Sequence, residues 1–171
     1  AVCHLFFVPG SQEAPPGWWP DGSYGSDASG GKHTKWPQIR RIGVGVAHLD
    51  NELEFQFGAW SGLPGIHQTV PRGELFGIML LLSNARPQGK YELFCDSLVN
   101  IKLFRAGKKV CLSSINCDLW ERVFEHLEGK CVDFTLTFSP SHLEDDKKLA
   151  KVAKKQVLVS RIGIACNVCA D

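Results

Sequence analysis

The fold of this chain is decided by one short stretch, Lys90-Tyr91-Glu92-Leu93-Phe94-Cys95-Asp96-Ser97. Its apolar residues predict a strand over residues 90–95 that runs directly into an acidic residue, Asp96. Residues 97–107 are then typical of a helix, which stops at Gly107. Because open sheets bind ligands at the carboxyl ends of their strands, an acidic residue in this place is a candidate binding-site residue.

The segments on either side of this stretch predict a sheet covered by helices. Apolar or alternating runs predict three earlier strands and one later strand, at about residues 22–28, 41–47, 53–59 and 132–138. Helical spacing of apolar residues predicts helices at residues 71–85 and 114–128, and the start of a final helix at 162–171. The sum is an α/β fold, a five-stranded mixed sheet flanked by helices.

Length and composition describe one globular domain. The 171 residues are 44% hydrophobic and 22% charged, and the net charge is +1. Affinity for nucleic acid would therefore have to come from local basic patches, for which the candidates are Arg40-Arg41, Lys108-Lys109, Lys147-Lys148 and Lys154-Lys155. Seven irregularly spaced cysteines argue for a reducing compartment, and no apolar run reaches the ~18 residues of a membrane span. We expect an intracellular protein of the cytoplasm or nucleus, neither secreted nor embedded in a membrane.

Both ends of the chain lie outside the predicted pattern. Residues 9–20 are rich in Pro and Gly, so residues 1–20 are expected to form an N-terminal linker or extension. The domain would then occupy residues 21–171. Because the chain starts without Met and stops early in its last predicted helix, we expect a domain cut from a longer polypeptide and truncated at its C-terminal end.

Four acidic residues along the chain occur in contexts that suit metal-binding carboxylates: Asp27, Glu74, Asp96 and Asp171. If the strands that lead to Asp27 and Asp96 are parallel neighbours, both carboxylates lie at one edge of the sheet. Glu74, in the first turn of the helix at 71–85, can reach that edge from above. Clustered carboxylates repel one another without cations, and oxygen ligands suit Mg²⁺, so the set predicts a two-cation site for phosphodiester hydrolysis.

The first ligand has a rival. Asp21 and Asp27 both sit beside Gly and Ser, where either could simply form a turn. Asp27 is preferred because Ser29-Gly30-Gly31 follows it and because it lies closer to Gly43.

Five short motifs, in this order, resemble those of ribonuclease H domains, most closely the reverse-transcriptase-associated domains of retroelements. The resemblance spans about residues 21–171. The family patterns Thr-Asp-Gly-Ser, Arg-Ala-Glu-Leu, Asp-Ser, a single His and Asn-x-x-Ala-Asp are similar, in turn, to Ser26-Asp27-Ala28-Ser29, Arg72-Gly73-Glu74-Leu75, Asp96-Ser97, Ser141-His142-Leu143 and Asn167-Val168-Cys169-Ala170-Asp171.

This resemblance implies a ribonuclease H-like fold and an endonuclease that hydrolyses the RNA strand of RNA–DNA hybrids with two Mg²⁺ or Mn²⁺ ions. It implies Asp27, Glu74, Asp96 and Asp171 as catalytic metal ligands, His142 as an aid to proton transfer or product release, and Ser29 and Ser97 as substrate contacts. The expected partners are the hybrid and a possible fused reverse transcriptase domain of a retroelement polyprotein. The alternative is a catalytically inactive nucleic-acid-binding or scaffolding module that kept the fold.

Two departures from the family pattern fall near Glu74. Gly73 replaces the usual Ala, at a cost of ~1 kcal/mol in helix propensity. Val70-Pro71 replaces the usual polar residues, so either Gln68 and Thr69 take over their contact with the hybrid or that contact is weaker.

Overall fold

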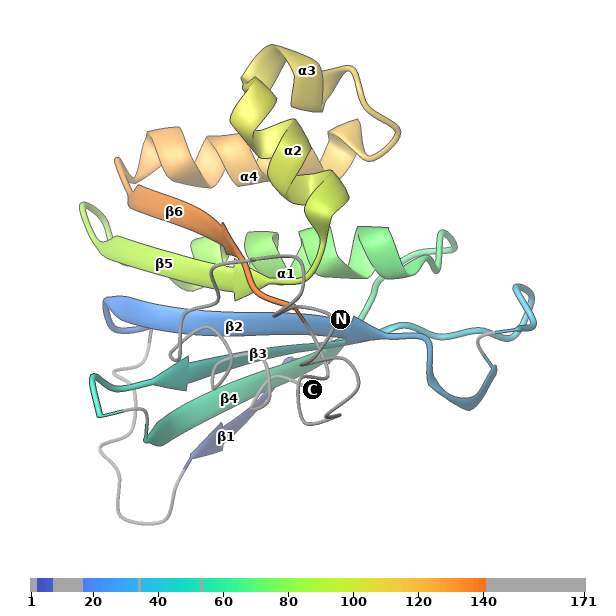
Figure 1. Ribbon diagram of the computed structural model, residues 1–171, viewed down its shortest axis with the longest axis horizontal. Helices are drawn as coiled ribbons and strands as arrows, with labels where there is room; N and C mark the ends of the chain where they lie inside the picture. The colour runs from blue at the N-terminus through green and yellow to red at the C-terminus, as the bar shows by residue number, and fades with distance from the viewer. Residues whose placement is uncertain (1–2, 8–16, 34, 53, 141–171) are drawn as a thin grey trace, which may run out of the picture.

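A six-stranded mixed sheet is the centre of the fold (Figure 1). The computed structural model describes residues 3–7, 17–33, 35–52 and 54–140. The strand order is β1-β4-β3-β2-β5-β6. The pairs β1–β4, β4–β3 and β3–β2 are antiparallel, whereas the pairs β2–β5 and β5–β6 are parallel. The bounds are β1 Cys3–Phe7, β2 Gly22–Ser29, β3 Gly43–Leu49, β4 Phe55–Gly62, β5 Lys90–Cys95 and β6 Asp133–Phe138.

The expected mixed sheet is confirmed, with one strand more than the five that were predicted. The additional strand, β1, pairs antiparallel with β4 from Cys3↔Ser61 to Phe7↔Phe57. It lies within residues 1–20, which were expected to be a linker or extension. The strand predicted at 41–47 begins two residues later, because the Ile42 N–H donates to the side chain of Gln68 instead of joining a ladder.

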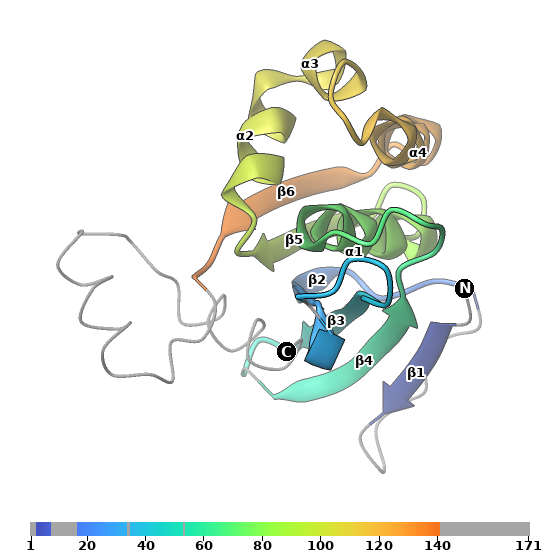
Figure 2. The ribbon, with the colours of Figure 1, turned by 90° about the vertical axis from the view of Figure 1, so that its right-hand side faces the viewer.

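The helices lie on one face of the sheet. Helix α1 (Val70–Asn84) packs against β2 and β3 and, on its other side, against α4 (Cys117–Gly129) (Figure 2). Helices α2 (Leu98–Ala106) and α3 (Lys108–Leu112) connect β5 to α4. The short α3 was not predicted; Gly107, with φ of 98°, separates it from α2. The final helix predicted at 162–171 lies outside the described residues.

Helix α1 is buried nearly all round, because the sheet and α4 cover it from two sides. Leu75, Ile78, Leu81 and Leu82 have no exposed surface. Burying each such side chain contributes roughly 1.5–3 kcal/mol. None of the described helices has the length and apolar character that a membrane crossing requires.

Two glycines set how closely α1 approaches the sheet. A Cβ added at Gly73 would lie 2.6 Å from Cγ2 of Ile42 and 2.8 Å from Cβ of Ala28. At Gly77 it would lie 3.1 Å from Cβ of Ser26. Gly73, which the sequence presents only as a loss of helix propensity, is therefore what lets the first turns of α1 lie against β2 and β3.

Candidate metal centre

Strands β2 and β5 diverge at the edge of the sheet where two of the predicted acids lie. Their parallel pairing runs from Gly22↔Tyr91 to Gly25↔Phe94. Beyond that point β2 continues beside β3 to Ser29, while β5 ends at Cys95 beside β6. Asp27 and Asp96 therefore lie in a fork between two parallel neighbours, which confirms the arrangement expected of these strands.

Glu74 enters the same fork from α1. It is the fifth residue of the helix, just past the first turn in which it was expected, because α1 begins at Val70. Its side chain is 2% exposed. The Ala28 N–H donates a 2.7 Å hydrogen bond to Oε1, whereas Oε2 is buried and has no hydrogen-bond partner in the described part of the protein. An ionised oxygen in that condition is costly unless a cation compensates it.

The three carboxylates meet. Asp27, Glu74 and Asp96 each offer one oxygen, and these oxygens lie within 4.8 Å of one another. Burial raises the pKa of Glu74 to about 9, with further contributions from Asp96 and Asp27 and an opposing one from the Ala28 N–H. Three hard oxygen donors, one of them buried and unpartnered, fit a divalent cation such as Mg²⁺ or Mn²⁺.

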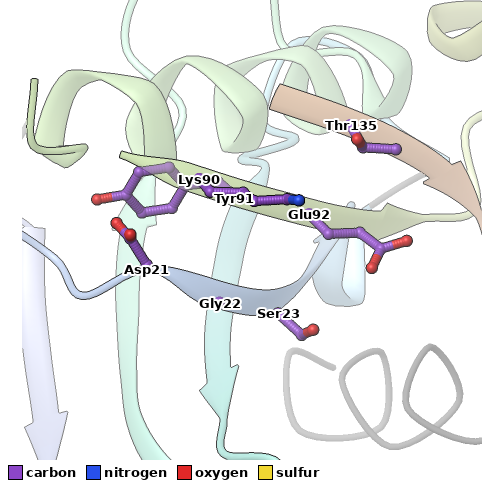
Figure 3. Close-up of a pocket in the computed structure, with 7 residues that line it drawn as sticks. All are labelled: Asp21, Gly22, Ser23, Lys90, Tyr91, Glu92 and Thr135. Atoms are coloured by element: carbon purple, nitrogen blue, oxygen red, sulfur yellow. The ribbon is translucent and has the colours of Figure 1, made fainter. Parts of the chain in front are cut away.

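Asp21, the rival for the first position, lies at the opposite end of β2. The Arg86 guanidinium donates to both of its carboxylate oxygens, with 2.7 Å from Nε to Oδ1, and lowers the pKa of Asp21. Figure 3 shows Asp21 beside Tyr91, in a pocket that Lys90 and Glu92 also line. The structure therefore brings Asp27, and not Asp21, to Glu74 and Asp96.

The two serines with predicted substrate contacts flank the acids. Ser29 is exposed at the end of β2, and its hydroxyl accepts a 3.3 Å hydrogen bond from the Gly31 N–H. Ser97 is half-buried at the N-cap position of α2. Their roles stay predictions. His142 and Asp171 lie outside the described residues, so their roles stay predictions too.

Gln68 has a structural position that sequence reasoning missed. Its side chain is 6% exposed, and its Oε1 accepts from the Ile42 N–H at 2.8 Å. Its Nε2 donates to the carbonyls of Leu63 at 2.8 Å and Gly65 at 2.7 Å. The buried side-chain amide of Gln68 is thus hydrogen-bonded to main-chain groups, whereas Thr69 is exposed. No local signal reveals this, because the three partners are main-chain groups of two separate loops.

Arg72, from the same motif as Glu74, ties the start of α1 to α4. Its Nη1 donates to Oδ1 of Asp118 at 2.8 Å and to Oδ1 of Asn116 at 3.1 Å. Asp118 raises the pKa of Arg72 and so favours its charged form. This contact fixes α1 from the side opposite the sheet, two residues before Glu74.

Comparison with known proteins finds similarity at the level of structure alone. No protein-family model matches the chain, and no curated protein matches its sequence. The structure is similar to the crystal structure of native prototype foamy virus protease-reverse transcriptase, with a TM-score of 0.52 and 18% sequence identity. The fold is ribonuclease H-like. The alignment covers 87% of this chain but 22% of the viral chain, so the chain spans about a fifth of the length of that protein.

The ribonuclease H-like fold accounts for how the acids meet. The parallel pair β2–β5 provides an edge at which Asp27 and Asp96 lie, and α1 crosses that edge with Glu74. The expected fold class is therefore confirmed, and three of the four predicted acids lie where they could hold a metal ion.

Proposed function

We propose that the chain is a divalent-metal-dependent endonuclease that hydrolyses the RNA strand of RNA–DNA hybrids. The observation that carries the proposal is the meeting of Asp27, Glu74 and Asp96, with Glu74 Oε2 buried and unpartnered in the described structure. Such a group destabilises a fold that has no cation to neutralise it. The ribonuclease H-like fold and the order of the sequence motifs support the choice of substrate.

The residues of the chain have distinct tasks in this proposal. Two Mg²⁺ or Mn²⁺ ions would polarise the scissile phosphate and supply hydroxide at neutral pH. Asp27 and Asp96 would hold them from the two sides of the fork. The Ala28 N–H fixes Oε1 of Glu74, so Oε2 is the oxygen left for coordination.

The remaining predicted residues complete the proposed site. Asp171 would be a fourth ligand, and His142 would assist proton transfer or product release. Ser29 and Ser97, on either side of the fork, would contact the substrate strand. Selection of a hybrid would depend on contacts to 2′-hydroxyl groups, which only the RNA strand supplies.

We further propose that this activity operates beside a reverse transcriptase domain in a retroelement polyprotein inside the cell. The similarity to a viral protease-reverse transcriptase supports this context. The net charge of +1 supports it as well, because strong phosphate binding requires several Lys or Arg contacts that a fused domain can provide. Residues 21–171 would form the nuclease domain and residues 1–20 its extension.

The test is cleavage of a labelled RNA–DNA hybrid with Mg²⁺ or Mn²⁺, beside double-stranded DNA and double-stranded RNA of the same sequence. We expect cuts in the RNA strand of the hybrid that leave 5′-phosphate and 3′-hydroxyl ends, and loss of cleavage in Asp96→Asn. Equal cleavage of double-stranded DNA, or full activity of Asp96→Asn, contradicts the proposal. Hybrid binding without cleavage, and without a metal-induced rise in melting temperature, identifies the inactive binding module instead.

A further inference from the structure

The loop between β2 and β3 concentrates positive charge beside the candidate metal centre. Lys32, Lys35, Arg40 and Arg41 fall within residues 30–42, and no acidic residue does. The whole chain carries +1, so the residues outside this loop together carry a net charge of −3. The positive charge of the protein is therefore unevenly distributed along the chain, and this loop is one of the segments that concentrate it.

The same loop exposes large apolar side chains among its cations. Trp36 is 64% exposed and Ile39 is 54% exposed. The carbonyl of Trp36 accepts from the N–H groups of Ile39 at 3.1 Å and Arg40 at 2.9 Å, and the Trp36 N–H donates to the His33 carbonyl at 2.9 Å. These bonds form a turn that exposes the indole of Trp36 to solvent. Burying this indole against a partner would remove a large apolar area from water.

The loop is anchored at the edge of the sheet where the carboxylates meet. It leaves β2 two residues after Asp27, and it returns through Ile42, which is 1% exposed and bonded to Gln68. In Figure 1 it projects beyond the end of β2, the end toward which β5 also points. Trp60, 49% exposed on β4, lies at its root, where a Cβ on Gly43 would be 3.4 Å from the indole Nε1.

We propose that this basic aromatic loop binds single-stranded nucleic acid that continues beyond the hybrid at the metal centre. Phosphates would contact Lys32 and Lys35, and an unpaired base would stack on Trp36. Cations interspersed with an exposed indole favour a nucleic acid over a protein partner, since bases offer faces and the backbone offers negative charge. The strand must be unpaired because the bases of a duplex are already stacked on each other. The inference rests on the proposed function in taking a nucleic acid as the substrate next to the loop.

The binding test uses labelled single-stranded DNA and RNA oligonucleotides and a blunt RNA–DNA hybrid, with fluorescence anisotropy in EDTA. We expect Trp36→Ala to raise the Kd for the single strands about ten-fold or more, as loss of one base–aromatic stack does. Trp36→Phe should keep most of the affinity. Trp18→Ala is the matched control, because that indole is 44% exposed and lies over Lys130 instead.

A salt titration tests the cations separately. Lys35→Gln should reduce the slope of log Kd against log salt concentration by about 0.7, the value for one lost phosphate contact on a single strand. Lys90→Gln is the control, since Lys90 is exposed at the opposite end of β5. Trp36→Ala should leave the slope unchanged.

Three results would overturn the inference: unchanged affinity in Trp36→Ala, equal salt slopes in Lys35→Gln and Lys90→Gln, or a change of oligomeric state in Trp36→Ala, which would assign the indole to a protein contact. Because EDTA prevents metal-dependent cleavage, these results are independent of the nuclease assay. A protein that binds single strands through Trp36 but never cuts a hybrid would contradict the proposed function and leave the loop assignment standing.

Discussion

The Ala28 N–H donates a hydrogen bond of 2.7 Å to Oε1 of Glu74, and so it joins β2 to α1 at the middle of the acidic group. The bond favours the ionised carboxylate, whereas burial and the charges of Asp96 and Asp27 favour the protonated form. Burial is the largest of these effects, and it brings the pKa of Glu74 to about 9. The metal-free protein at neutral pH therefore holds a protonated acid at this position.

Replacing Glu74 with Gln should change how stability depends on pH. Folded Glu74 keeps its proton up to about pH 9, while an ordinary glutamate ionises near 4.5. Its contribution to stability is fully present below pH 4.5 and is lost as the pH rises through about 9. Metal-free Glu74→Gln should therefore match the wild type in acid and exceed it by about 2 kcal/mol or more at pH 8. Urea unfolding in EDTA across this range measures the difference, and parallel stability curves would contradict it.

Metal binding should release a proton from Glu74. A cation that coordinates the carboxylate displaces the bound proton, so affinity for Mg²⁺ or Mn²⁺ should rise about ten-fold per pH unit between pH 6 and 8. Isothermal titration calorimetry in buffers of different ionisation enthalpy should detect about one proton released per site filled. Binding with no proton release would show that Glu74 does not coordinate the ion.

Asp27→Asn and Asp21→Asn form a matched pair that tests which aspartate serves the site. Asp27→Asn should abolish the metal-induced rise in melting temperature, which in the wild type corresponds to about 2.7 kcal/mol at a hundred times the Kd. Asp21→Asn removes an ion pair whose side chains are 33% and 55% exposed, so it should cost at most about 1 kcal/mol and keep the metal response. The reverse pattern would assign the site to Asp21.

Gly73→Ala should destabilise the protein although alanine is the better helix former. The new methyl group would lie 2.6 Å from Ile42 Cγ2 and 2.8 Å from Ala28 Cβ. Overpacking of this kind costs about 1–3 kcal/mol, which outweighs the ~1 kcal/mol gained in propensity. Gly129→Ala, with nothing near its added Cβ, is the control and should be neutral or stabilising.

Adding Ala28→Gly to Gly73→Ala tests the cause of that loss. The double variant removes one of the two clashing groups, so part of the lost free energy of unfolding should return. Urea unfolding measures the free energy of unfolding of the wild type, Gly73→Ala, Gly129→Ala and the double variant. If Gly73→Ala were as stable as the wild type, the close seating of α1 would not depend on this glycine.

Local patterns were enough to predict β5, α1 and the acids attached to them. The apolar run before Asp96 and the helical spacing after Pro71 are properties of neighbouring residues, and the observed bounds differ from the predicted ones by one residue at most. The mixed sheet followed from the order of such elements. The preference for Asp27 over Asp21, which was based on Ser29-Gly30-Gly31 and on the distance to Gly43, agrees with the structure, because Asp27 meets Glu74 and Asp96. No local pattern predicts the ion pair of Asp21, because its partner Arg86 is 65 residues away.

Other features were hidden because they depend on contacts between distant segments. The reason for Gly73 lies in Ile42 and Ala28, which no helix pattern includes. The buried amide of Gln68 is defined by three main-chain partners, and β1 by its pairing with β4. The packing of Gly73, the hydrogen bonds of Gln68 and the pairing of β1 with β4 are therefore properties of the folded structure that no local sequence pattern predicts.

The fork between β2 and β5 has a consequence for motion. Their ladder stops at Gly25 and Phe94, so main-chain hydrogen bonds of this ladder do not join the two strand ends that lead to Asp27 and Asp96. An ion shared by these aspartates would act as a crosslink across the opening. Amide hydrogen exchange in this part of the sheet should then slow when the metal is added, because local opening would require the crosslink to break. The metal site proposed for catalysis would then also hold the diverging ends of β2 and β5 together.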